Sequence, residues 1–179
     1  IKQGNRNPLL YKNVGVDGVK TGYLAVEKYS LASSMKKKER RVIAVVSGFD
    51  TKNLRSSESL KLLNWGFRNT NTFEISKKDE TMFELDTWLG EKNKIKVASK
   101  DDYYVTINKK DISNLTISLE YEGPIAAPVK KGKQIGNIVV SKKDEILKSV
   151  PLYAAEDLKK VNFFKSLLTS LNYLIWGDA

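Results

Sequence analysis

Two residue types are missing from this sequence, and their absence removes whole classes of chemistry. The chain has no cysteine, so it can form no disulfide, no thiolate zinc site and no cysteine nucleophile. It also has no histidine, which excludes a Ser-His-Asp triad and a histidine metal site. If acyl transfer takes place here, its base must be another residue, and lysine is the usual substitute. We therefore expect neither a metal ion nor a cofactor.

An initiator methionine is also missing, because the sequence begins at Ile1, and we expect a fragment whose signal peptide, if any, lies outside it. The 179 residues suffice for one ordinary domain or two small ones, and an apolar share of 41% allows a buried core. The net charge of +10 suits an anionic partner. Most lysines cluster at expected turns, and aromatic residues are not interleaved with them, so we expect no nucleic acid partner.

The first seventy residues read as three strands and a helix. Alternating and β-branched patterns predict strands over residues 15–21, 29–35 and 42–48, joined by short links in an antiparallel meander. Asp50-Thr51 then forms an N-cap pair for a helix over residues 52–67. Gly66 near its end is typical of a helix stop.

The first strand ends in the motif Lys20-Thr21-Gly22. A lysine and a threonine offer a positive charge and a hydroxyl donor, which suits a bound carboxylate. The glycine leaves room for a close approach to the backbone. An ordinary strand end before a turn has the same pattern, so the tripeptide alone is a weak signal.

Four stretches in order resemble the end of the catalytic domain of D-alanyl-D-alanine carboxypeptidases, the low-molecular-mass penicillin-binding proteins with the serine β-lactamase-like fold. These stretches are Asn5-Arg6-Asn7-Pro8-Leu9-Leu10, Val16-Asp17-Gly18-Val19-Lys20-Thr21-Gly22-Tyr23, Tyr29-Ser30-Leu31-Ala32-Ser33-Ser34 and Glu58-Ser59-Leu60-Lys61-Leu62-Leu63-Asn64-Trp65-Gly66-Phe67. The family uses three motifs, Ser-x-x-Lys, Ser-x-Asn and Lys-Thr-Gly.

Only the third motif stands here. The run Ser34-Met35-Lys36-Lys37 scans as Ser-x-x-Lys, but it follows Lys-Thr-Gly on a predicted strand, whereas the family's nucleophile precedes it on a helix. The resemblance therefore implies that the nucleophilic serine lies upstream of Ile1, and that this chain alone does not turn over substrate.

The resemblance also implies a role for each matching residue. Lys20 supports the electrostatics of the site, and Thr21 donates to the terminal carboxylate of the substrate. Gly22 completes the motif, and the backbone N–H of Tyr23 supplies half of the oxyanion hole. Two arginines, Arg55 and Arg6, match residues near the substrate carboxylate, which a guanidinium can hold bidentately. A surface arginine without such a role is the alternative for both.

Residues 71–158 change to short alternating runs, which predict a β-sandwich or a small barrel. Expected strands are 72–75, 94–98, 103–107, 116–121, 125–129, 134–140 and 146–152. No catalytic constellation appears, and the pair Asp101-Asp102 fits a turn better than a metal site. The family's second domain is also β-rich, where its role is to space the active site from the membrane or to contact partners.

Residues 159–179 predict an amphipathic helix. Its apolar face comprises Val161, Phe163, Phe164, Leu167, Leu168, Leu171, Leu174 and Ile175, with Tyr173 and Trp176 suited to a membrane interface. The segment is too short and too polar to span a bilayer. We expect it to lie in a membrane interface, as the family's C-terminal anchor does; packing on the β-rich domain and a dimer contact are the alternatives.

These observations predict an α+β chain: residues 1–70 as the end of a transpeptidase-like sheet with its packing helix, residues 71–158 as an all-β domain, and residues 159–179 as the anchor. The resemblance implies a serine carboxypeptidase at the periplasmic face of the bacterial cytoplasmic membrane. Its substrate is a peptidoglycan stem peptide ending in D-Ala-D-Ala, and β-lactams are its inhibitors. The alternative is a non-catalytic, β-rich module that binds a membrane or a protein.

Overall fold

The computed structural model describes residues 4–177, without the side chains of Thr169 and Tyr173. The chain forms two compact units: residues up to Thr72 with Ile107–Lys110, and residues Phe73–Thr106 with those from Asp111 onward. Each unit has its own hydrophobic core.

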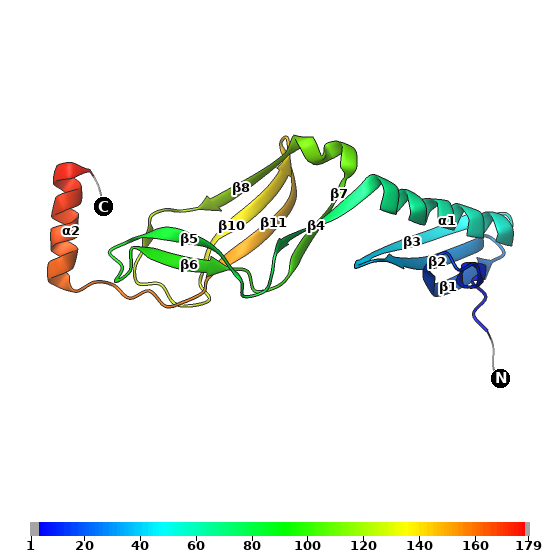
Figure 1. Ribbon diagram of the computed structural model, residues 1–179, viewed down its shortest axis with the longest axis horizontal. Helices are drawn as coiled ribbons and strands as arrows, with labels where there is room; N and C mark the ends of the chain where they lie inside the picture. Colours follow the sequence, from blue (N-terminus) through cyan, green and yellow to red (C-terminus); the bar gives the residue numbers. More distant parts are fainter. Residues whose placement is uncertain (1–3, 178–179) are drawn as a thin grey trace. The chain divides into compact units, whose positions relative to one another are not determined.

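The first unit is a three-stranded antiparallel sheet with a helix on one face (Figure 1). Strands β1 (Val16–Leu24), β2 (Lys28–Lys37) and β3 (Arg40–Phe49) follow in spatial order, and the short 3-10 helix η1 (Pro8–Tyr11) precedes them. The predicted meander is present, with each strand longer than the sequence pattern indicated.

Helix α1 (Lys52–Asn69) buries Leu63 against one face of this sheet. Leu9, Leu31, Met35 and Leu63 are at most 1% exposed. Val19, Ile43 and Val45 have 51%, 63% and 76% of their surface exposed. Burial in this unit is therefore one-sided.

Helix α1 begins at the predicted N-cap but ends later than predicted. Thr51 is the N-cap, because its hydroxyl accepts from the Leu54 N–H at 3.1 Å. The expected stop at Gly66 is wrong, because the helix continues to Asn69. Gly66 is buried, and a Cβ there would lie 3.1 Å from Cγ1 of Val42 on β3. The glycine therefore allows close packing of helix on strand.

The second unit is built on a six-stranded sheet in the order β8-β10-β11-β6-β5-β9. The strands in chain order are β5 (Thr81–Trp88), β6 (Lys94–Ala98), β8 (Leu115–Tyr121), β9 (Ile125–Ala126), β10 (Gln134–Lys142) and β11 (Glu145–Ala154). A separate pair is formed by β4 (Thr70–Ser76) and β7 (Tyr103–Asn108), and the 3-10 helix η2 (Lys109–Asn114) precedes β8. The core includes Ile95, Val97, Val150 and Leu152, all fully buried.

Two strand predictions in this unit were wrong. Strand β5 was missed, although it pairs with β6 through the buried partners Leu85 and Ile95. The expected strand 125–129 stops at Ala126, because Pro128 has no N–H to donate, and Val129 makes only an isolated bridge to Leu158.

Helix α2 (Phe163–Trp176) forms within the predicted tail but begins later than expected. Val161 lies before it, with its N–H bound to the Leu89 carbonyl oxygen at 3.0 Å. Asn162 caps the helix, since its side-chain oxygen accepts from the Lys165 N–H at 3.0 Å. Residues 178 and 179 of the predicted segment lie outside the described residues. Among the helices described, none is long and apolar enough to cross a membrane.

Candidate functional site

The prediction that the first strand ends at the motif was wrong, because β1 continues to Leu24 and has Lys20 and Thr21 in its middle. Among the described residues, β2 is the one partner of β1 in the sheet of the first unit, so β1 is an edge strand. Lys20 pairs with Ala32, and Thr21 with Leu31, so their side chains leave opposite faces of the strand. Lys20 is exposed, and its Nζ lies 3.5 Å from the Thr21 carbonyl oxygen. Within the described part of the chain, no carboxylate pairs with this ammonium group, so it is available to an anion.

The glycine of the motif lies against a side chain of the neighbouring strand. Gly22 pairs with Ser30 on β2, and a Cβ at Gly22 would collide with the Ser30 hydroxyl oxygen. The close approach to the backbone that the sequence predicted at Gly22 is therefore made by a side chain of the next strand. Ser30 explains why this position suits glycine.

Two asparagines of the segment before β1 form hydrogen bonds to the backbone of that strand. The Asn5 side-chain amide donates to the Val19 carbonyl oxygen at 3.0 Å, and the Asn7 amide donates to the Gly18 carbonyl oxygen at 3.1 Å. Asn7 is fully buried and also accepts from the Leu9 N–H at 3.1 Å. Arg6 stands between these two residues and is exposed. The attachment holds Arg6 beside the strand that carries Lys20.

A second group of side chains gathers where β1 ends and β2 begins. The rings of Tyr23 and Tyr29, a register pair, have centroids 4.7 Å apart. The guanidinium carbon of Arg55, from the first turns of α1, lies 5.7 Å from the centroid of Tyr29. Tyr23 is 60% exposed, whereas Arg55 is 5% exposed. The structure thus brings Tyr23 and Arg55, two of the predicted residues, to one end of the sheet.

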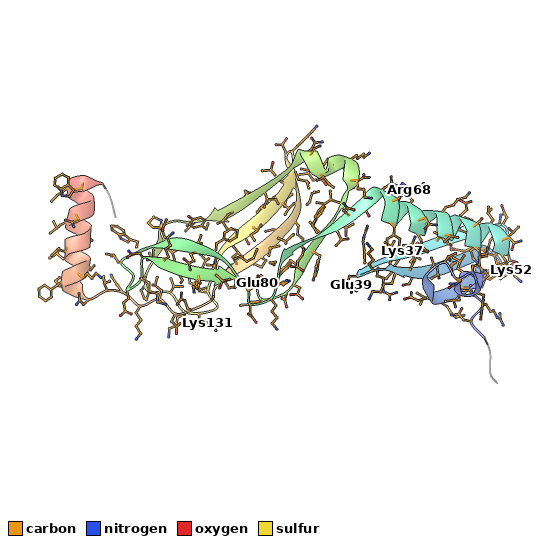
Figure 2. The ribbon with its side chains drawn as sticks, in the orientation of Figure 1. Lys37, Glu39, Lys52, Arg68, Glu80 and Lys131 are labelled. Atoms are coloured by element: carbon orange, nitrogen blue, oxygen red, sulfur yellow. The ribbon has the colours of Figure 1, made fainter. Side chains whose placement is uncertain are left out.

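The serine of the chance Ser-x-x-Lys match is engaged in a structural contact. Ser34 is buried on β2, and its hydroxyl oxygen accepts from the Arg41 guanidinium, which also binds Asp17 at 2.7 Å. Hydrogen bonds from Arg41, then from Ser34, hold the pKa of Asp17 below its usual value. Lys37 near the hairpin tip (Figure 2) donates instead to Asn64 at 3.2 Å. Ser34 is therefore no candidate nucleophile.

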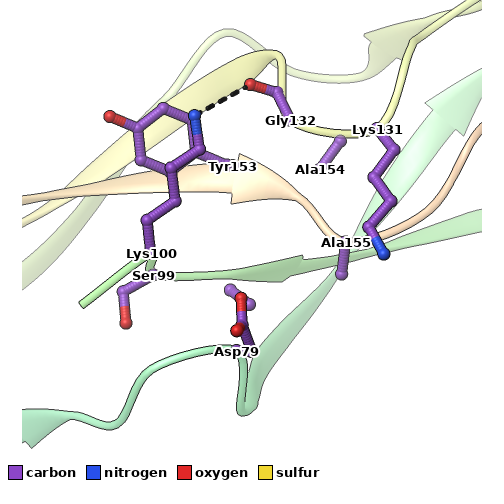
Figure 3. A pocket seen from close by; sticks show the side chains of 9 residues that line it. Asp79, Ser99, Lys100, Lys131, Gly132, Tyr153, Ala154 and Ala155 are labelled. Atoms are coloured by element: carbon purple, nitrogen blue, oxygen red, sulfur yellow. Dashed lines mark hydrogen bonds between the residues drawn. The ribbon is translucent and has the colours of Figure 1, made fainter. Parts of the chain in front are cut away.

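The second unit contains a cavity that the sequence did not indicate (Figure 3). It has a volume of about 340 Å³ and is lined by Asp79, Lys100, Lys131 and Tyr153 together with small residues. The Lys100 ammonium lies 3.8 Å from the centroid of the Tyr153 ring and 3.5 Å from the Gly132 carbonyl oxygen. Its walls come from turns and strand ends that are far apart in the sequence, so no local pattern could have predicted the cavity.

The acidic pair of this unit has a structural role at Asp102, whose carboxylate accepts from the Lys78 N–H at 2.8 Å. Across residues 4–177, no three carboxylates come together in a group that could hold a metal ion.

Two family models match the chain. Residues 71–160 match the C-terminal domain of penicillin-binding protein 5, and residues 1–51 match D-alanyl-D-alanine carboxypeptidase. The sequence is 36% identical over 166 residues to D-alanyl-D-alanine carboxypeptidase DacC of Escherichia coli, covering 92% of this chain and 42% of that protein. It is 33% identical over 164 residues to DacF of Bacillus subtilis, covering 91% of this chain and 42% of that protein.

Solved structures give the same relationship. Penicillin-binding protein 5 from Haemophilus influenzae superposes with a TM-score of 0.79 at 35% identity, over 89% of this chain and 47% of that one. The carboxypeptidase DacD from Francisella tularensis has a TM-score of 0.64 at 31% identity, over 89% and 40%. The chain thus spans less than half the length of these relatives. It belongs to the low-molecular-mass penicillin-binding proteins, the D-alanyl-D-alanine carboxypeptidase family, and corresponds to their C-terminal portion.

Proposed function

We propose that this chain is part of a serine-type carboxypeptidase that removes the terminal D-alanine from peptidoglycan stem peptides. The names of its relatives describe them as D-alanyl-D-alanine carboxypeptidases. In this chain, the observation that supports it most is the exposed Lys20 on an edge strand, without a carboxylate partner among the described residues. A cation that is neither buried nor paired can bind the carboxylate at the end of a peptide.

In this proposal, the three-stranded sheet and α1 form the end of a transpeptidase-like catalytic domain. Lys20 supports the electrostatics of the site, Thr21 donates to the substrate carboxylate, and Gly22 keeps the strand close to β2. The Tyr23 N–H provides one donor of the oxyanion hole, and Arg6 and Arg55 add positive charge for the carboxylate. A serine upstream of Ile1 attacks the peptide bond. A β-lactam reacts with the same serine, because its carboxylate and carbonyl imitate those of the peptide.

We also propose that α2 attaches the protein to the periplasmic face of the cytoplasmic membrane. Its eight large apolar residues, Phe163, Phe164, Leu167, Leu168, Leu171, Leu174, Ile175 and Trp176, are each 49–84% exposed. A helix with so much uncovered apolar surface gains free energy by entering a lipid interface. The side chain of Tyr173, also suited to an interface, lies outside the described residues.

Labelled penicillin tests the catalytic proposal. The longer protein, with its upstream segment, should be acylated, and Lys20→Ala should slow acylation about 100-fold or more, the scale of losing one electrostatic group in such a site. Lys12→Ala, which removes another exposed lysine of the first unit, is the matched control and should react as the unchanged protein does. Absence of labelling in the longer protein would overturn the proposal.

A further inference from the structure

Arg55 is a buried cation without a counter-ion. Its side chain is 5% exposed, its Nε is fully buried with no hydrogen-bond partner, and among the described residues no carboxylate forms an ion pair with it. Burial lowers the pKa of this guanidinium, because the charged form loses hydration. A buried charge is normally paired. This arrangement is therefore incomplete by itself and favours an incoming anion.

The group that does approach Arg55 is the ring of Tyr29, 5.7 Å from centroid to guanidinium carbon. Tyr29 is half-buried on β2, and its ring also packs on Tyr23 at 4.7 Å with an interplanar angle of 43°. The three side chains form a continuous run from the end of β1 across β2 to α1. A displacement of the Tyr29 ring would remove the cation–π contact of Arg55 and the ring contact of Tyr23 together.

An aromatic ring can hold an arginine in a way that a carboxylate cannot. The ring face attracts the cation through its quadrupole and accepts none of its N–H groups in the way that a carboxylate oxygen does. A carboxylate would neutralise the charge and occupy the fork of donors that binds a planar anion bidentately. A ring partner therefore fixes the position of the guanidinium and leaves its charge and its donors for a ligand.

We propose that Tyr29 is a positioning residue for recognition of the substrate carboxylate. Its ring holds the Arg55 guanidinium at the end of the Lys-Thr-Gly strand. The same ring packs on Tyr23, whose backbone N–H is the proposed oxyanion donor. The inference rests on the proposed carboxypeptidase function and adds a residue that touches neither the substrate nor the serine. The needed property is the aromatic face, and the phenolic hydroxyl is dispensable.

Steady-state kinetics of the longer protein test this role, with a peptide ending in D-Ala-D-Ala and the same peptide with its terminal carboxylate amidated. Tyr29→Leu should raise KM for the acid peptide roughly 3- to 30-fold, the range of a cation–π contact that is partly or fully shielded from water. Tyr29→Phe should have a KM for the acid peptide within about twofold of that of the unchanged protein, because the ring face remains. Tyr121→Leu, an exposed tyrosine of the second unit, is the control and should change neither value.

The amidated peptide separates positioning from loss of structure. With no carboxylate to recognise, Tyr29→Leu and the unchanged protein should have the same KM. If Tyr29→Leu raises KM equally for both peptides, or for neither, the inference is wrong. If Tyr29→Leu does not fold, Tyr29→Met replaces it, because the unbranched, flexible methionine side chain adapts to an irregular gap and supplies no ring. Failure of the unchanged protein to release D-alanine would instead overturn the proposed function.

Discussion

The two units of this chain differ in where they carry charge. The first unit, residues 1–72 with 107–110, contains 16 lysines and arginines against 5 acidic residues, whereas the second contains 15 against 16. The whole net charge of +10 therefore comes from the unit that carries Lys20 and Arg55. The excess suits a unit that binds anionic ligands, since a local surplus of cations raises the concentration of anions near it.

Both units pair some of their charged groups, and the part of the first unit that the structure describes also carries cations without an acidic partner. In the second unit, Lys92 pairs with Glu156 and Lys142 with Asp111, the latter at 3.0 Å. In the first unit, neither Lys20 nor Arg55 has an acidic partner among the residues described. The first unit also contains ion pairs, such as Lys28 with Asp50 and Arg41 with Asp17. The absence of an acidic partner among the described residues is therefore a property of Lys20 and Arg55 themselves and not of every cation in that unit.

The largest expected effect concerns the one-sided core of the first unit. Leu63→Ala should lower the free energy of unfolding of that unit by about 2–5 kcal/mol, because a fully buried leucine leaves a cavity. Leu62→Ala, on the same helix and 43% exposed, is the matched control and should cost well under 1 kcal/mol. Chemical denaturation, monitored through hydrogen exchange at the amides of β2, measures the free energy of unfolding of both variants. Equal effects would contradict the packing of α1 described here.

A smaller effect is expected at the segment that precedes β1. Asn7→Ala should cost about 1–3 kcal/mol, because it leaves the Gly18 carbonyl and the Leu9 N–H without their partner in a buried place. Asn5→Ala, at an exposed position, should cost less. Thermal unfolding of the two variants gives the comparison. A loss at Asn5 as large as that at Asn7 would show that burial does not decide the difference.

The smallest effect is a pH dependence in the first unit. The pKa of Asp17 is lowered chiefly by the Arg41 hydrogen bond, so its ionised form stabilises the folded state. This stabilisation is present above the unfolded pKa of 3.8 and is lost as pH falls through the lower folded value. Asp17→Asn should therefore reduce the free energy of unfolding slightly at neutral pH. It should also make that free energy depend less on pH below about pH 4. Denaturation midpoints from pH 2 to 7 test this, and an unchanged pH dependence would contradict it.

Local sequence patterns were sufficient for the first unit. Three alternating runs and a Thr51 cap predicted its strands and helix, because each element depends on neighbours in the sequence. In the second unit, β5 was missed although Glu84 and Asp86 alternate with its apolar residues, and the strand order of the sheet depends on pairings between distant segments. Local patterns contain no information on such pairings.

In the candidate site too, contacts between residues distant in the sequence could not be predicted. The motif at Lys20 was readable because its residues are adjacent, and the resemblance added Arg55. Tyr29 could not be connected with Arg55 from the sequence, since the contact depends on how α1 lies over β2. The side chain that approaches Gly22 could not be identified for the same reason, because Ser30 meets Gly22 only across the strand pair.

The most direct test of the central claim, that β1 binds the carboxylate end of a peptide, is the rate of D-alanine release by the longer protein. Thr21→Val removes the proposed donor at nearly constant volume, and Thr116→Val makes the same change on an exposed threonine of β8. The account predicts a kcat/KM lowered about 10-fold or more by Thr21→Val, the effect of an unpaired charged group at a binding site, and unchanged by Thr116→Val. Equal kcat/KM for Thr21→Val and the unchanged protein would contradict it.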